Sequence, residues 1–226
     1  MSVNPLHAWT VDPEAAVKIQ EGLRDQLNLE WDGRAVKTVG GVDISLKDDR
    51  ARAAIVVLGF PELFPLEEAT SEVPLVFPYI PGLLTFREGP AVLAAWEKLA
   101  QKPDLIMFDG QGIAHPRGIG IASQMGLWLD RPTIGVAKSR LYGRHDEVGL
   151  EPGEVAALYD QRQPEKMIGG VVRTKKNTKP LYISPGHLID VQHAVDFVLR
   201  CVRGYRLPEP TRWAHNIAGG ATLPSG

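Results

Sequence analysis

Two aspartates lie within runs of residues that favour β-strands. Asp43 is flanked by Val42 and Ile44 in the run 38–46, and Asp109 directly follows the apolar run 105–108. A carboxylate is costly to bury alone in such a setting, and a cation is the partner that offsets this cost best. On neighbouring strands, the two carboxylates would form a site of hard oxygen ligands suited to Mg²⁺ or Mn²⁺. The sequence therefore predicts metal-assisted hydrolysis as the leading chemistry.

Length and composition predict one large soluble domain. The chain has 226 residues, of which 44% are hydrophobic and 23% charged, enough for a sizeable core. Its single cysteine, Cys201, cannot form an internal disulfide. No signal core opens the sequence, and no apolar run approaches the roughly 20 residues that span a bilayer. We expect a cytoplasmic monomer that makes no contact with membranes, with one domain over residues 1–218 and a disordered tail at 219–226.

The order of the predicted elements indicates an α/β fold. Asp12 and Pro13 mark a helix start, as N-cap and first helical residue. Three strand-like runs joined by short turns are typical of an antiparallel meander: 38–46, 53–58 and 66–73. Helices at about 89–101 and 119–129 then alternate with buried strands at 105–108 and 133–137. Two strands around a basic turn, at 168–173 and 181–183, and a helix after Asp190 follow. The pattern predicts a mixed central sheet, with three antiparallel strands followed by parallel strands, flanked by helices.

Several polar residues near predicted strand and helix ends could take part in chemistry. Glu88, at a predicted helix start, is either a further metal or water ligand or a carboxylate favoured by the helix dipole. Lys138 follows the strand 133–137 and either neutralises a phosphate or is an ordinary surface lysine. His115 and His187 lie in loops, where each either contacts phosphate or water or structures its loop. His215 could return to the site as a general acid, a base or a water-mediated metal ligand.

Two further features allow nucleic-acid binding without requiring it. The loop 77–82 has two prolines that stiffen it around Tyr79, which either enters a base stack as a wedge or packs into the protein's own core. The net charge is −2, so any basic surface must be local. Two basic runs are candidates, although each run alone fits an ordinary solvated face better: Arg173, Lys175, Lys176 and Lys179, and Arg200, Arg203, Arg206 and Arg212.

Taken together, these stretches resemble the endonuclease V family, the deoxyinosine-specific repair nucleases. The resemblance covers about residues 7 to 216 and rests on eight ordered motifs: Gly41-Val-Asp43, Phe77-Pro-Tyr-Ile-Pro-Gly-Leu-Leu84, Phe86-Arg-Glu88, Phe108-Asp-Gly-Gln-Gly-Ile-Ala-His-Pro-Arg117, Gly120-Ile-Ala-Ser123, Pro132-Thr-Ile-Gly-Val-Ala-Lys138, Ser184-Pro-Gly-His187 and Pro208-Glu-Pro-Thr-Arg-Trp-Ala-His215. It implies a ribonuclease H-like fold and Mg²⁺-dependent hydrolysis, with Mn²⁺ as a substitute. The implied cut is at the second phosphodiester bond 3′ to deoxyinosine and leaves 3′-hydroxyl and 5′-phosphate ends. The implied partner is double- or single-stranded DNA with this lesion, and inosine-containing RNA is a further candidate.

The resemblance also implies roles for individual residues. Asp43, Asp109 and Glu88 would bind metal, Lys138 would assist at the scissile phosphate, and His215 would lie near a second metal position. The wedge would consist of Tyr79 with Pro78, Ile80 and Pro81. The other implied DNA- and lesion-binding residues are Leu84, Gly110, Gly112, His115, Ile121, Gly135 and Leu141. One position departs from many relatives, because Gln124 replaces a histidine and does not titrate near neutrality.

Two other functions fit part of the pattern. A module that binds inosine without cutting would not need the set Asp43, Glu88, Asp109 and Lys138, so a nicking assay with Mg²⁺ separates it from a nuclease. A ribonuclease H-like nuclease for junctions or RNA–DNA hybrids would keep the carboxylates. It would need neither the Tyr79 loop nor a pocket for a base.

Overall fold

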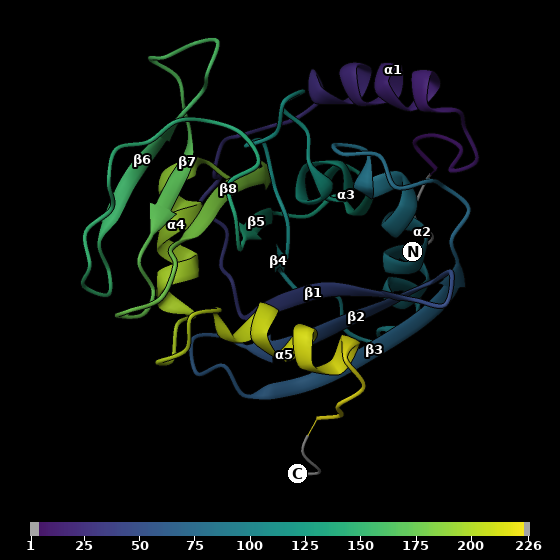
Figure 1. Cartoon of the computed structure of the whole chain (residues 1–226). Helices are drawn as coiled ribbons and strands as arrows, with labels where there is room; N and C mark the ends of the chain where they lie inside the picture. The colour runs from purple at the N-terminus through teal and green to yellow at the C-terminus, as the bar shows by residue number, and fades with distance from the viewer. Residues whose placement is uncertain (1–4, 224–226) are drawn as a thin grey trace.

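The structure is a computed structural model that describes residues 5–223. Its strands are β1 (Thr38–Lys47), β2 (Arg50–Gly59), β3 (Pro65–Pro74), β4 (Leu105–Phe108), β5 (Thr133–Ala137), β6 (Val155–Tyr159), β7 (Met167–Val172) and β8 (Leu181–His187). Its helices are α1 (Pro13–Arg24), α2 (Leu84–Lys98), α3 (Ile121–Leu129), α4 (Val191–Arg200) and α5 (Glu209–Ala218). The eight strands form one sheet in the order β3-β2-β1-β4-β5-β8-β7-β6 (Figure 1).

The sheet is mixed, as the sequence predicts. β1, β2 and β3 form the expected antiparallel meander, and β4 pairs in parallel with both β1 and β5. The remaining neighbouring strands pair antiparallel. Because β1, β4 and β5 run in the same direction, the residues at their carboxyl ends meet at one edge of the sheet, which we call the carboxyl edge. Asp109 and Lys138 directly follow β4 and β5 at this edge, and Asp43 lies within β1 at the level where β4 ends.

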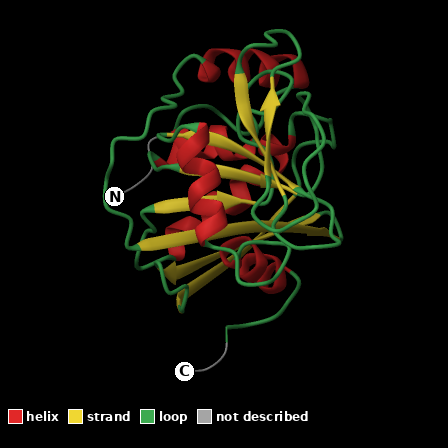
Figure 2. Cartoon of the chain, turned by 90° about the vertical axis from the view of Figure 1, so that its left-hand side faces the viewer, coloured by secondary structure: helices red, strands yellow, loops and turns green. Residues whose placement is uncertain are grey.

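Helices pack on both faces of the sheet (Figure 2). α4 and α5 cover the face that contains Val39, Ala54 and Leu58. α2 and α3 cover the other face, which contains Val42 and Phe108. Since side chains alternate along a strand, Asp43 shares the face of Val39, on the α5 side of the sheet. Side chains from both layers of helices can therefore reach the carboxyl edge.

Three elements differ from their predictions. α2 begins at Leu84 rather than near residue 89, and Pro90 lies inside it, so Glu88 is in the second turn instead of at the helix start. α5 and β6 are not predicted. The two prolines near the start of α5 resemble a loop, but a proline in the first turn lacks only an N–H that would have no partner there. β6 is an edge strand with mostly half-exposed side chains, which give little apolar signal.

The chain after α5 makes two hydrogen bonds within the described residues. The amide of Ala221 donates to the carbonyl of Asn216, and that of Leu223 donates to the carboxylate of Glu68. The division into a domain over residues 1–218 and a disordered tail at 219–226 stays a prediction, and residues 224–226 lie outside the described residues. Within residues 5–223, none of the helices has the length and hydropathy needed to cross a membrane.

Candidate active site

The sheet brings Asp43 and Asp109 side by side. Val42 of β1 pairs with Phe108 of β4, and the amide of Asp109 donates to the carbonyl of Val42 at 2.9 Å. The next residue of each strand is therefore an aspartate at the same level of the carboxyl edge. Asp43 is only 8% exposed. The prediction that these two strands are neighbours is confirmed.

His215 joins the two carboxylates from α5. Its Nδ1 lies 2.7 Å from Oδ2 of Asp43. One ligand atom from each of Asp43, Asp109 and His215 lies within 4.8 Å of the other two. Metal–oxygen and metal–nitrogen bonds of about 2.0–2.6 Å allow a single ion to reach all three atoms. Two carboxylate oxygens with one imidazole nitrogen form a donor set that fits a divalent cation.

Lys138 supplies the positive charge nearest to this cluster. Its Nζ forms an ion pair with Oδ2 of Asp109. Burial raises the pKa of Asp109, the hydrogen bond from Lys138 opposes this rise, and the neighbouring Asp43 carboxylate adds to it, with a net shift upward. Lys138 alone therefore does not neutralise the site, and a bound cation would stabilise its ionised form.

Glu88 stands beside the cluster but outside the set of three. Burial, reinforced by the charges of Asp43 and Asp109, raises the pKa of Glu88 to about 7. Among the described residues, His215 rather than Glu88 completes the set of mutually close ligand atoms. A direct metal bond from Glu88 remains a prediction.

Glu88 should make the stability of the metal-free protein depend on pH. Its pKa in the folded state is about 7, against 4.5 for the ordinary group. Between these two values the folded protein holds a proton on Glu88 that the unfolded chain has lost. The stability that goes with this proton is fully present below pH 4.5 and is lost as the pH rises through 7. The loss corresponds to about 3 kcal/mol for the isolated group. We expect Glu88→Gln to unfold at higher urea than the unsubstituted protein at pH 8 in EDTA, and at similar urea at pH 4.5. Glu97→Gln, on the exposed face of α2, is the matched control.

A pocket of about 280 Å³ adjoins the carboxylates. Glu88, Asp109 and Lys138 line it. Seven of the residues predicted to bind DNA or the lesion also line it: Tyr79, Pro81, Leu84, Gly110, His115, Ile121 and Leu141. Tyr79 is 65% exposed at the rim, so it does not pack into the protein's own core. The pocket is also lined by residues to which the sequence assigns no role: Gly82, Thr85, Gln111, Gly120, Ala137 and Ser139.

Four of the residues predicted to bind DNA or the lesion do not line this pocket. Pro78 and Ile80 flank Tyr79 in the loop without forming the wall. Gly112 and Gly135 lie behind the wall, where a Cβ on Gly135 would be 2.2 Å from the amide nitrogen of Gly112. These two glycines therefore allow the loop after β4 to pack directly on β5. That packing places Gly110 in the pocket wall.

The loop 77–82 is fixed through the carbonyl of Gly82. Three side chains donate to this oxygen: Gln20 of α1 at 3.1 Å, His115 at 3.1 Å and Arg117 at 2.6 Å. Burial, with a contribution from Arg117, lowers the pKa of His115 to about 4, so this imidazole is neutral and holds the loop. The sequence gives one missed signal for this network, because Gln20 is a polar residue at a buried position of α1.

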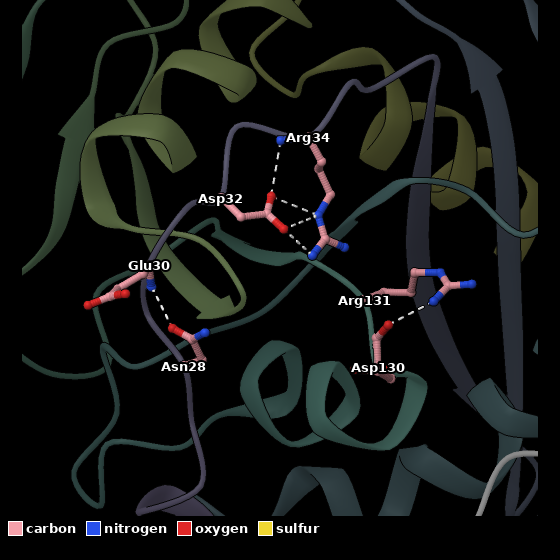
Figure 3. A network of polar contacts seen from close by, with 6 residues as sticks. All are labelled: Asn28, Glu30, Asp32, Arg34, Asp130 and Arg131. Carbon is pink, nitrogen blue, oxygen red and sulfur yellow. Dashed lines mark hydrogen bonds and ion pairs between the residues drawn. The ribbon is translucent and has the colours of Figure 1, made fainter.

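Two other residues highlighted by the sequence lie away from the cluster. His187 ends β8 at the edge opposite to the carboxyl edge, and its Nδ1 accepts from the amide of Asn28 at 3.3 Å. Figure 3 shows the segment from Asn28 to Arg34 in this region. Gln124 is fully buried in α3, and its amide nitrogen is 2.9 Å from Nε2 of His7. Both contacts hold segments of the chain in place.

Comparison with known proteins agrees with the resemblance in sequence. The family model described as Endonuclease V matches residues 21–216. An Endonuclease V of Methanothrix thermoacetophila is 46% identical over 218 residues, which are 96% of each chain. The crystal structure of an Endonuclease V from Streptomyces avermitilis has a TM-score of 0.87 at 38% identity and covers 94% of this chain and 93% of its own.

A further structural relative was crystallised with nucleic acid. The Endonuclease V of Ciona intestinalis, in complex with a 24mer DNA containing an inosine followed by a ribo-adenosine, has a TM-score of 0.80 at 27% identity and covers 92% of this chain and 97% of its own. The mixed sheet with flanking helices is thus the ribonuclease H-like fold of these enzymes. From the family match and the relatives that span nearly its full length, the chain belongs to the Endonuclease V family.

Proposed function

We propose that this protein, an endonuclease that acts near deoxyinosine in DNA, hydrolyses the second phosphodiester bond 3′ to the lesion and leaves 3′-hydroxyl and 5′-phosphate ends. The observation that supports this most directly is the cluster of Asp43, Asp109 and His215 with Lys138 paired to Asp109, next to a pocket that Asp109 and Lys138 line. A protein that only binds inosine would gain nothing from carboxylates that face a phosphate. A nuclease that reads only shape would not need the pocket.

Each residue of the cluster would have its own role at the scissile phosphate. Mg²⁺, for which Mn²⁺ can substitute, would be held by Asp43, Asp109 and His215 and would supply Lewis acidity when bound. Lys138 is placed to neutralise charge that develops on the phosphoryl oxygens. The contact of Nδ1 of His215 with Oδ2 of Asp43 holds the half-exposed imidazole ring beside the two carboxylates, where a ring nitrogen can bind the ion.

The pocket next to the cluster has the features of a site for an everted base. Its mostly apolar wall, with Leu84, Ile121 and Leu141, can cover the faces of a purine, while the backbone at Gly110 can approach the edge of the base. Hypoxanthine pairs poorly, so extruding it costs less than extruding a normal base. Tyr79 at the rim would fill the vacated stack, and the hydrogen bonds to Gly82 would keep its loop rigid.

Cleavage of end-labelled duplexes tests this proposal. The duplexes differ by one deoxyinosine and are incubated across a series of Mg²⁺ concentrations, with a single-stranded form and an inosine-containing RNA as further substrates. We expect a single nick at the second bond 3′ to the lesion that requires the metal. In the same assay, Tyr79→Ala should lower the preference for the lesion over undamaged DNA. Equal cutting of both duplexes by the unsubstituted protein would contradict the assignment.

A further inference from the structure

The fold brings parts of two basic runs together beside the active site. The turn between β7 and β8 lies against the connection between α4 and α5, near the start of α5 (Figure 1). Thr174 in this turn donates to the carbonyl of Arg206, and Nε of Arg206 donates to the carbonyl of Lys179. Nη2 of Arg206 donates to the carbonyl of Lys138 at 2.7 Å. One arginine therefore ties both basic segments to the residue that pairs with Asp109.

An exposed tyrosine lies between cations from the two segments. Tyr205 is 52% exposed. The guanidinium carbon of Arg212 is 4.4 Å from the centre of its ring, and Nζ of Lys175 is 5.9 Å from it. We call Lys175, Tyr205, Arg206 and Arg212 the Tyr205 patch. An aromatic ring interleaved with basic side chains is the surface that binds single nucleic-acid strands, by stacking and by phosphate contacts.

The guanidinium of Arg212 is held in a fixed orientation. Its Nε and Nη2 donate to the buried carboxylate of Glu209 at 2.8 and 2.6 Å. Its Nη1 has no partner among residues 5–223, and Lys175 forms no ion pair within the same range. Arg212 is also one helical turn before His215 on α5. A phosphate bound by Nη1 would thus lie close to the metal ligands.

Not all members of the basic runs contribute. Nη2 of Arg203 donates to the carbonyl of Pro61, away from this patch, and Lys176 is paired with Glu151. Charges at the opposite edge of the sheet are also satisfied locally, as Figure 3 shows for Arg34, whose Nη2 is 2.6 Å from Oδ2 of Asp32. Within the two basic runs, Lys175 and Arg212 therefore keep N–H groups that a ligand next to α5 can use.

The pocket and the Tyr205 patch lie on opposite sides of the metal ligands. The pocket is built from α2, α3 and the loops beside them, whereas the patch adjoins α5 on the other face of the sheet. We propose that the patch binds the segment of the cut strand on the 3′ side of the scissile bond. Lys175 and Arg212 contact its phosphates, and the Tyr205 ring supports a base or a sugar. The polarity rests on the proposed function, because a lesion in the pocket lies 5′ to the bond that is cut.

Binding and cleavage of truncated substrates test this proposal. The lesion strand is either full length, shortened just beyond the cut on its 3′ side, or shortened by the same amount on its 5′ side. With full-length DNA, Tyr205→Ala should weaken binding about tenfold, and Tyr205→Phe should not. Lys175→Gln should reduce the slope of log K against log salt by about 0.7–0.9. With the strand shortened on the 3′ side, all variants should bind like the unsubstituted protein.

Controls separate this proposal from folding defects and from the proposed function. Lys37→Gln removes an exposed lysine at the opposite end of β1 and should change neither affinity nor salt slope. Variants with an unchanged urea midpoint would overturn the proposal if they lose affinity equally for all three substrates, or if they lose it for the 3′-shortened strand and not for the 5′-shortened one. Failure of the unsubstituted protein to nick deoxyinosine DNA would refute the proposed function. The binding comparison would still decide whether the patch holds the 3′ segment.

Discussion

Asp109→Asn should reduce cleavage of deoxyinosine DNA by on the order of 10³-fold or more. Asp109 combines two functions at the centre of the site, since it lies within ligand distance of Asp43 and His215 and pairs with Lys138. The amide of Asn is close in shape to the carboxylate but uncharged. It therefore binds a hard cation more weakly and leaves Lys138 without its ion-pair partner. Single-turnover cleavage at saturating protein, across Mg²⁺ concentrations, measures the loss.

Binding should be affected much less than cleavage. Asp109→Asn leaves the pocket, the Tyr79 loop and the Tyr205 patch in place. It also removes a negative charge, which lowers the electrostatic repulsion of phosphates. Fluorescence anisotropy in EDTA should therefore give an affinity close to that of the unsubstituted protein. Asp130→Asn is the matched control, because Asp130 caps α3 in the left-handed conformation, which Asn tolerates well. Cleavage at an undiminished rate by Asp109→Asn would refute the metal site.

The pairing of the two aspartates could be predicted because it depends on local signals and a simple rule of topology. The runs around Asp43 and before Asp109 are apolar enough to be strands in any context. The helix between β3 and β4 leads the chain back so that β4 lies parallel to β1. Glycines after Asp109 indicated a loop at a strand end. These features were sufficient to place both carboxylates at one edge.

The third ligand could not be placed on the same grounds. His215 is 172 residues from Asp43 in sequence, and its position depends on a helix whose start has two prolines. The position of Glu88 within its helix differs from the prediction for a related reason. Pro90 suggested a helix that starts next to it, while the apolar contacts of Phe86 with α1 and the Tyr79 loop extend α2 back to Leu84. In α2, tertiary packing outweighs the local preference of Pro90, whereas the prolines of α5 lie at its start, where a helix accepts them.

Gly41→Ala should cause the largest loss of stability among the substitutions considered, together with a loss of activity. A Cβ on Gly41 would lie 1.9 Å from the carbonyl oxygen of Pro210 and 2.1 Å from its carbon. Both are backbone atoms in the first turn of α5, so the helix must move away from β1. Overpacking of this kind costs about 1–3 kcal/mol or more, which urea unfolding measures. Because α5 carries His215, a shift near 1 Å should also reduce cleavage about 10²-fold.

Two comparisons distinguish this mechanism from a general effect of alanine. Gly22→Ala adds the same methyl group in α1, where no atom lies within 4 Å, and it should be neutral or stabilising by up to about 1 kcal/mol. If Gly41→Ala acts through His215, the double variant with His215→Ala should cleave no more slowly than His215→Ala alone. Additive losses would instead show that the close approach of α5 to β1 supports activity by another route. An unchanged urea midpoint in Gly41→Ala would mean that α5 does not pack against Gly41 as closely as the structure has it.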